Sequence, residues 1–126
     1  MELNEYQKKA LSTCMDSCDN FSYMMLNLVG EVGEFSSKIG KAIRKGNLSI
    51  NECKIYTNFK GNLEEEHNAT NEFKDLLKAE AGDILWQLSG LCHVLGWKLE
   101  DVAKTNLDKL ASRQSRGVID GNGDKR

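Results

Sequence analysis

The chain has 126 residues and a formal net charge of −2; 40% of its residues are hydrophobic, 29% are charged and none is proline. This composition favours one soluble, helical domain, and the charge argues against a stable nucleic-acid partner, which usually needs a dense basic face. Because no apolar run approaches the ~20 residues of a membrane span and the first residues lack a signal-peptide pattern, we expect no membrane partner and a cytoplasmic protein.

The spacing of apolar residues predicts two helices in the first part of the chain. Residues 2–18 predict a first helix of moderate periodicity, and Asp19 and Asn20 predict a turn and cap after it. The second helix follows, and we expect Gly46 to end it. Its apolar residues alternate four and three positions apart, which predicts a packing seam between near-parallel helices. The seam residues are Phe21, Met25, Leu28, Val32, Phe35, Ile39 and Ala42.

The second part of the chain predicts an insertion and two further helices. Residues 46–71 predict a polar insertion, in which a loop is favoured over a short strand at residues 55–59. A third helix begins between residues 62 and 71, carries a seam from Leu77 to Leu95, and is ended by Gly96. A fourth runs over residues 99–113, with Leu107 and Leu110 among its inward side chains. We therefore expect an all-α fold, a four-helix bundle-like core in one domain over residues 1–126.

Three of these helices carry a polar triad with the spacing i, i+3, i+7, which places its side chains on one helix face. Each triad lies one residue before an apolar series and therefore borders the predicted core. We expect the triads to converge where helices two, three and four meet. An ordinary solvated face is the alternative, and it is disfavoured for the acids because neighbouring like charges and helix glycines both reduce stability. The triads are Glu31/Glu34/Lys38, Glu80/Asp83/Gln87 and Asn106/Lys109/Arg113.

The two acidic pairs predict a site for a hard cation. Clusters of carboxylates favour Mg²⁺ or Mn²⁺ over zinc or copper. A di-iron bundle needs Glu-x-x-His pairs, and neither acidic pair is followed by a histidine at that spacing. The four cysteines form no CxxC pair, so a zinc site is disfavoured and we expect reduced thiols.

These motifs resemble the MazG-like nucleotide pyrophosphohydrolases, a group within the all-α nucleoside triphosphate pyrophosphatase superfamily. Glu31-Val-Gly-Glu34 and Glu80-Ala-Gly-Asp83 have the ExxE…ExxD form of that superfamily. Leu95-Gly96 and the segment 106–113 follow in the family's order, so the resemblance spans nearly the whole chain. The interval between the acidic pairs is longer than is usual in the family, with the excess in residues 46–71.

The resemblance implies Mg²⁺-dependent hydrolysis of a (deoxy)nucleoside triphosphate to its monophosphate and pyrophosphate, as nucleotide-pool house-cleaning, by a homodimer or homotetramer. It implies that Glu31, Glu34, Glu80 and Asp83 bind the metal and that Glu34 also activates water. The alternatives are an enzyme like phosphoribosyl-ATP pyrophosphohydrolase, a dUTP- or dCTP-specific enzyme, and a helical interaction module without catalysis. The expected substrate contacts are Lys38, Trp86, Asn106, Lys109 and Arg113.

Overall fold

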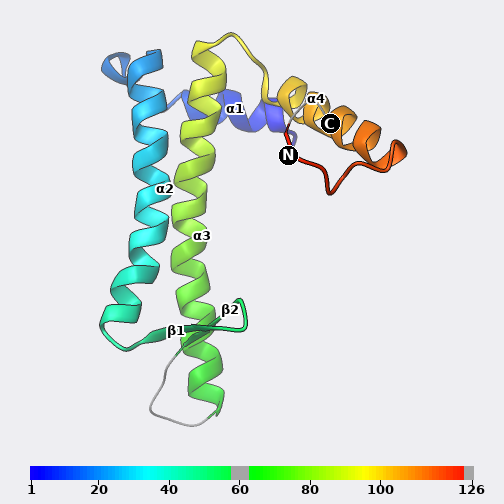
Figure 1. Ribbon diagram of the computed structural model, residues 1–126. Coiled ribbons are helices and arrows are strands. Elements are labelled where there is room, and N and C mark those ends of the chain that lie inside the picture. The colour runs from blue at the N-terminus through cyan, green and yellow to red at the C-terminus, as the bar shows by residue number, and fades with distance from the viewer. Residues whose placement is uncertain (58–62, 124–126) are drawn as a thin grey trace.

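The computed structural model describes residues 1–57 and 63–123, and for residues 63–70 it describes the backbone only. Helices dominate it, and the predicted all-α class is confirmed (Figure 1). None of the helices in the described residues is both long and apolar enough to cross a lipid bilayer. The elements in chain order are α1 (Leu3–Leu11), the short 3₁₀ helix η1 (Asp16–Cys18), α2 (Phe21–Arg44), strands β1 (Leu48–Asn51) and β2 (Lys54–Thr57), α3 (Leu63–Val94) and α4 (Leu99–Ser115).

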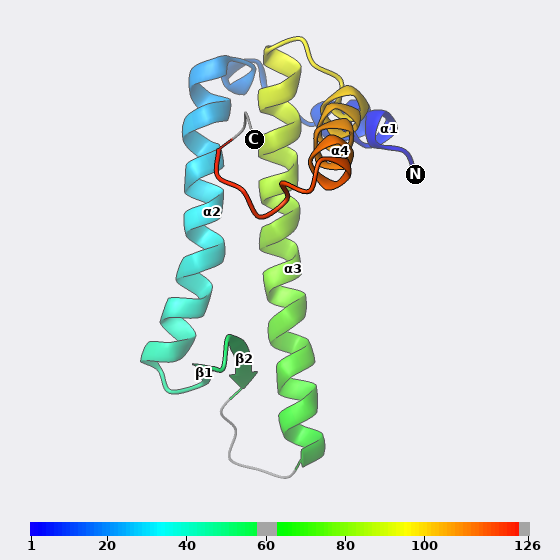
Figure 2. The same cartoon turned by 45° about the vertical axis from the view of Figure 1, so that its right-hand side comes forward.

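The long helices α2 and α3 run antiparallel, side by side, and form the spine of the molecule (Figures 1 and 2). Helix α1 packs across α3, and α4 packs against α1. As a result α4 lies to the side of the spine instead of completing a closed four-helix core with it (Figure 1). The acidic pairs lie on the two spine helices, so their arrangement depends on how α2 and α3 meet.

Helix α1 is shorter than the helix that we predicted over residues 2–18. It ends at Leu11, where the hydroxyl groups of Ser12 and Thr13 donate to the carbonyls of Lys9 and Ala10, each at 2.6 Å. Serine and threonine offer the backbone this alternative to further helix, which explains the early stop. The other predicted boundaries agree with the structure, because the Asn20 side chain caps α2 and Gly46 follows its end.

The predicted seam of α2 is only partly right. Phe21 and Val32, both expected to face the core, are 49% and 47% exposed. Met24 is instead fully buried, and it lies against Gly90 of α3, where an added Cβ would overlap the methionine sulfur. Leu107 of α4, also expected inward, is 64% exposed. The buried face is therefore shifted by one residue at the start of α2, from Met25 to Met24, whereas the predicted seam residues Leu28, Phe35 and Ile39 are partly buried.

The insertion contains a β-hairpin where we favoured a loop. Strands β1 and β2 are antiparallel and pair Ile50 with Ile55, the kind of β-branched pair that stabilises a ladder. The turn between them has positive φ at both central residues, Glu52 (50°) and Cys53 (63°). Such turns usually carry asparagine or glycine, and because Glu52 and Cys53 are neither, the hairpin had no recognisable turn signal. Phe59, part of the predicted segment, lies outside the described residues.

Two amide side chains of α1 cap the first turn of α4. The backbone N–H of Leu99 donates to Gln7 Oε1 (3.1 Å), and that of Glu100 donates to Asn4 Oδ1 (3.0 Å). The residue before α4 supplies no side-chain cap of its own. Since Gln7 is 8% exposed and also donates to backbone carbonyls of α3 and of the α3–α4 linker, α1 holds α4 in place.

The contact between Met24 and Gly90 generates a stability prediction. Gly90→Ala places a methyl group on the buried Met24 side chain, and overpacking of this kind costs about 1–3 kcal/mol. Gly40→Ala on α2 is the matched control, because a Cβ there meets nothing within 4 Å and alanine gains up to about 1 kcal/mol of helix propensity. Urea unfolding should show Gly90→Ala less stable than Gly40→Ala; equal stability of the two variants would contradict the close approach.

Candidate functional site

Three of the four predicted metal ligands converge between the spine helices. Glu31 projects from α2, and Glu80 and Asp83 project from α3, each offering a carboxylate oxygen within 4.8 Å of the others. Glu31 and Glu80 are half-buried and Asp83 is exposed. The i, i+3 spacing puts the two α3 acids on one face, and the antiparallel packing of α2 turns Glu31 toward them.

The remaining residues of the first triad lie beside this cluster. Glu34 is exposed and lies outside the group of three, one helical turn after Glu31. Lys38 Nζ lies 3.5 Å from Glu80 Oε1, so its cation faces the acids as the i, i+7 spacing from Glu31 predicts. This ion pair offsets part of the negative charge.

The carboxylates of the cluster repel one another. The pKa of Glu31 is raised above its ordinary value because the group is buried and because the charges of Asp83, Glu80 and Glu34 disfavour a further negative charge; the hydrogen bond from Asn27 works in the opposite direction. Burial, followed by the charge of Asp83, also raises the pKa of Tyr6. Strained, like-charged groups of this kind are typical of functional sites.

Two amides lie in the site: Gln87, which belongs to the second polar triad, and Asn27, which was not singled out in the sequence analysis. Asn27 Nδ2 donates to Gln87 Oε1 across the spine at 2.8 Å and to Glu31 Oε1 at 3.4 Å. Gln87 is only 2% exposed. The available signal was positional, because Asn27 lies four residues before Glu31 and Gln87 four residues after Asp83, where a helix repeats its face.

The other predicted substrate contacts lie apart from the acids. The Trp86 indole donates to the α1 carbonyl of Ala10 (3.0 Å), which gives it a role in holding α1. Asn106 and Lys109 are exposed on α4, and Arg113 is only 4% exposed. At this exposure Arg113 is shielded from a phosphate in solvent in the single chain. The burial of Arg113 was not predicted because it arises from tertiary packing, which helix spacing does not reveal.

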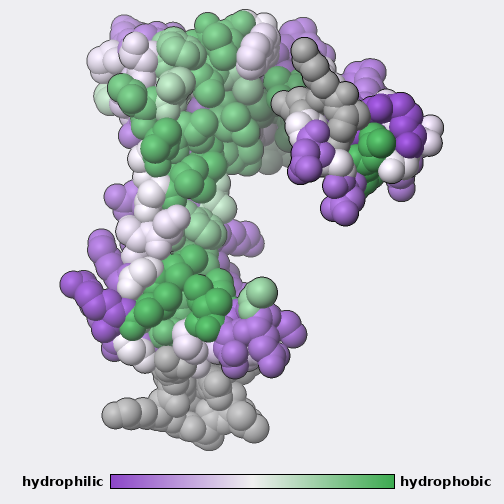
Figure 3. Space-filling view, in the orientation of Figure 1, coloured by the Kyte–Doolittle hydropathy of each residue, from purple (hydrophilic) through white to green (hydrophobic). Residues whose placement is uncertain are grey.

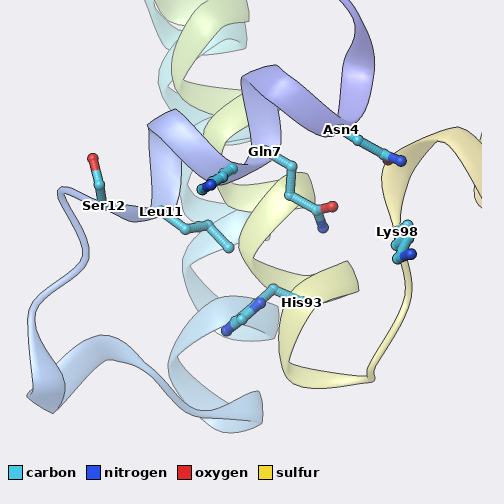
Figure 4. Close-up of a pocket in the computed structure, with 7 residues that line it drawn as sticks. Asn4, Gln7, Leu11, Ser12, His93 and Lys98 are labelled. Carbon is cyan, nitrogen blue, oxygen red and sulfur yellow. The ribbon is translucent and has the colours of Figure 1, made fainter.

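A cavity of about 510 Å³ lies between α1 and the end of α3, where Gln7 and Leu11 project from α1 toward the segment carrying His93 (Figure 4). None of the predicted site residues lines it. The acidic cluster, and not this cavity, carries the chemistry that the sequence predicts. The lining residues are Asn4, Gln7, Lys8, Leu11, Ser12, His93 and Lys98.

The donor set fits a hard divalent cation. Glu31, Glu80 and Asp83 supply only carboxylate oxygens, the ligands that Mg²⁺ and Mn²⁺ prefer. A Cβ added at Gly33 or Gly82 meets nothing within 4 Å. These two glycines are therefore not sites of close helix approach, which occurs at Gly90 instead.

The raised pKa of Glu31 predicts how stability depends on pH. Glu31 keeps its proton to a higher pH in the folded chain than in the unfolded chain. The ionised Glu31 carboxylate therefore destabilises the fold above the ordinary glutamate pKa of ~4.3, and this cost grows until the pH has passed the pKa of Glu31 in the folded chain. Metal-free Glu31→Gln should thus be more stable than wild type at neutral pH and lose this advantage toward pH ~4. Thermal melts in chelator across this range test it, with the exposed Glu72→Gln of α3 as control. A wild type that overtakes Glu31→Gln as pH rises would contradict the assignment.

Comparison with known proteins identifies the family of this chain. Residues 19–118 match the family model of the MazG nucleotide pyrophosphohydrolase domain, a segment that contains all four acids. The Gene 37 protein of Mycobacterium phage L5 is 35% identical over 133 aligned residues that cover 100% of both chains. No solved structure matches the chain significantly. The family model and this relative together show that the chain belongs to the MazG nucleotide pyrophosphohydrolase family.

Proposed function

We propose that this protein hydrolyses nucleoside triphosphates to the monophosphate and pyrophosphate with the help of Mg²⁺, and so clears the nucleotide pool of unwanted members. The observation that carries the proposal is the convergence of Glu31, Glu80 and Asp83 from two helices in a chain of this family. Membership of the family disfavours a helical module without catalysis. A preference for dUTP, dCTP or phosphoribosyl-ATP is a narrower version of the same chemistry.

The reaction requires water to attack the α-phosphorus. The new P–O bond forms as the bond from the α-phosphorus to the bridging oxygen breaks, and pyrophosphate leaves with that oxygen. Glu34 is the proposed general base that accepts the water proton, because it is exposed and lies one turn from the cluster. When bound, a divalent cation would supply positive charge that neutralises the triphosphate and polarises the reacting phosphoryl group. Glu31, Glu80 and Asp83 would hold it.

Cationic and polar side chains complete the proposed site. Lys38 already lies at the carboxylates, from which a lysine reaches the oxygens of a bound phosphate as a point charge. Asn106 and Lys109 are exposed on α4, and we assign them to sugar or phosphate oxygens. In the single chain α4 packs on α1, so these contacts call for a second chain beside the first.

We propose that the chain works as a homo-oligomer. Its accessible surface is 9,333 Å², whereas a compact monomer of 14.1 kDa exposes about 6,700 Å². The excess is of the order of a stable subunit interface, which buries roughly 1,200–2,000 Å² or more. Leu26 and Val29 of α2 are 70% and 68% exposed, and Figure 3 shows hydrophobic residues gathered over this end of the spine. We propose that a second copy of the chain packs on this hydrophobic surface.

The activity prediction concerns Glu80. Purified protein with Mg²⁺ should convert at least one nucleoside triphosphate of a canonical and modified panel to its monophosphate plus pyrophosphate. Glu80→Gln should lose about 10²-fold or more of this activity, because it removes a charged ligand from the metal that stabilises the transition state. Product analysis by anion exchange, with and without chelator, makes the measurement.

Glu72→Gln is the matched control, since it neutralises an exposed glutamate of the same helix. It should keep wild-type activity. Release of a diphosphate and phosphate, activity that persists in chelator, or full activity of Glu80→Gln would each refute the proposed chemistry.

The assembly prediction concerns Leu26. Wild-type protein should have the mass of a dimer or tetramer by light scattering, and Leu26→Glu should shift it toward the monomer because the substitution places a charge in the proposed interface. Met15→Glu is the control, since Met15 is comparably exposed (66%) but precedes the spine. A monomeric wild type, or an equal shift in both variants, would rule out this surface as the interface.

A further inference from the structure

We propose that Asn27 is a positioning residue for the cation site. Its side chain holds the Glu31 carboxylate in place, and Gln87 of the opposite helix in turn holds the Asn27 side chain. The inference rests on the proposed function, because it concerns how the same carboxylates are oriented. It adds Asn27 to the site and gives a specific role to Gln87, the third member of the Glu80/Asp83/Gln87 triad.

The geometry places the amide pair directly beside the acids. Asn27 lies one turn before Glu31 on α2, and Gln87 lies one turn after Asp83 on α3. Because the helices run antiparallel, both residues fall at the same level of the spine, one turn from the carboxylates. Asn27 Nδ2 has two hydrogens, and it donates to Gln87 Oε1 at 2.8 Å and to Glu31 Oε1 at 3.4 Å. It also donates to Tyr23 Oη at 3.3 Å, so the hydrogen that does not face Gln87 is shared between Glu31 and Tyr23.

Gln87 is held in the orientation that this arrangement requires. Its Nε2 donates to the carbonyl of Met24 at 3.4 Å, which leaves Oε1 turned toward Asn27. At 2% exposure Gln87 has little access to water, so loss of Asn27 would remove the hydrogen bond that Gln87 Oε1 accepts at a buried position, which is costly. Gln87 therefore fixes the orientation of the Asn27 side chain, because one Nδ2 hydrogen of Asn27 is bonded to Gln87 Oε1 on α3.

Glu31 needs such a partner more than the other acids do. It is the single contributor from α2 to the three-carboxylate group, and both of its neighbours in that group carry the same charge. Repulsion favours rotation of the Glu31 side chain away from α3, and the hydrogen bond from Asn27 opposes that rotation. Groups that hydrogen-bond to metal ligands, without binding the metal themselves, typically contribute about 10–100-fold to metal affinity.

The test measures cation binding directly, with Mn²⁺ as the probe and no nucleotide present. Isothermal titration is made on wild type, Asn27→Leu, Gln87→Leu and the double variant, with thermal melts in chelator to establish folding. Asn27→Leu should weaken Mn²⁺ binding by about 10–100-fold and Gln87→Leu by less. The double variant should bind no more weakly than Asn27→Leu, because Gln87 acts through Asn27. Should Asn27→Leu fail to fold, Asn27→Ala takes its place.

Gln7→Leu is the matched control, since Gln7 is also a buried glutamine with three hydrogen bonds, but its partners are Ser89 of α3, Trp97 of the α3–α4 linker and Leu99 of α4, and none of them is a carboxylate of the cluster. It should lower stability and leave Mn²⁺ affinity unchanged, whereas a merely structural role for Asn27 would make the two variants alike. Wild-type affinity in Asn27→Leu, or losses that multiply in the double variant, would overturn the inference while leaving the proposed function intact. A wild type that binds no Mn²⁺ would overturn both.

Discussion

The axial register between α2 and α3 is the constraint on which the rest of the structure depends. The fully buried Met24 lies against Gly90, and this close approach is compatible with few relative positions of the helices. The same register sets Glu31 opposite the acids of α3 within 4.8 Å. A slip of one turn moves one helix by about 5.4 Å along the other, which separates the carboxylates by more than the span of the cluster.

Polar residues on the packing face carry a structural cost that explains the unusual surface of this chain. Because Glu31 and Asn27 occupy part of the α2 face that meets α3, less of that face is available to apolar side chains. Leu26 and Val29 accordingly lie on the opposite side, where they are exposed. The helix packing that brings the acids together therefore also leaves the apolar side chains of Leu26 and Val29 exposed to solvent.

Features with local causes were predictable from the sequence. The cap at Asn20 and the stop at Gly46 arise from a few neighbouring residues, and the spacing within each acidic pair determines its own face. The choice between Met24 and Met25 as the buried residue was not predictable. Helix α2 is apolar on two faces, and periodicity alone does not say which of them meets α3.

Other features depended on distant parts of the chain or lacked their usual signal. The hairpin turn at Glu52 and Cys53 has the backbone geometry of an asparagine-glycine turn without either residue, so composition favoured a loop. The burial of Arg113 and the engagement of Trp86 with α1 arise from packing between helices. Asn27 and Gln87 carried a positional signal, yet their pairing required the relative register of two helices that are separated by the whole insertion.

The capping of α4 by Asn4 and Gln7 joins the two ends of the chain. These hydrogen bonds connect residues more than 90 positions apart, so they form only when nearly the whole chain is present, although loop-closure entropy grows only slowly with the length of the intervening segment. During synthesis α1 emerges first but completes its contacts only after residue 100 has followed. The residues that cap α4 also precede the segment matched by the family model. A fragment trimmed to that segment would keep all four acids and lose the caps that place its last helix.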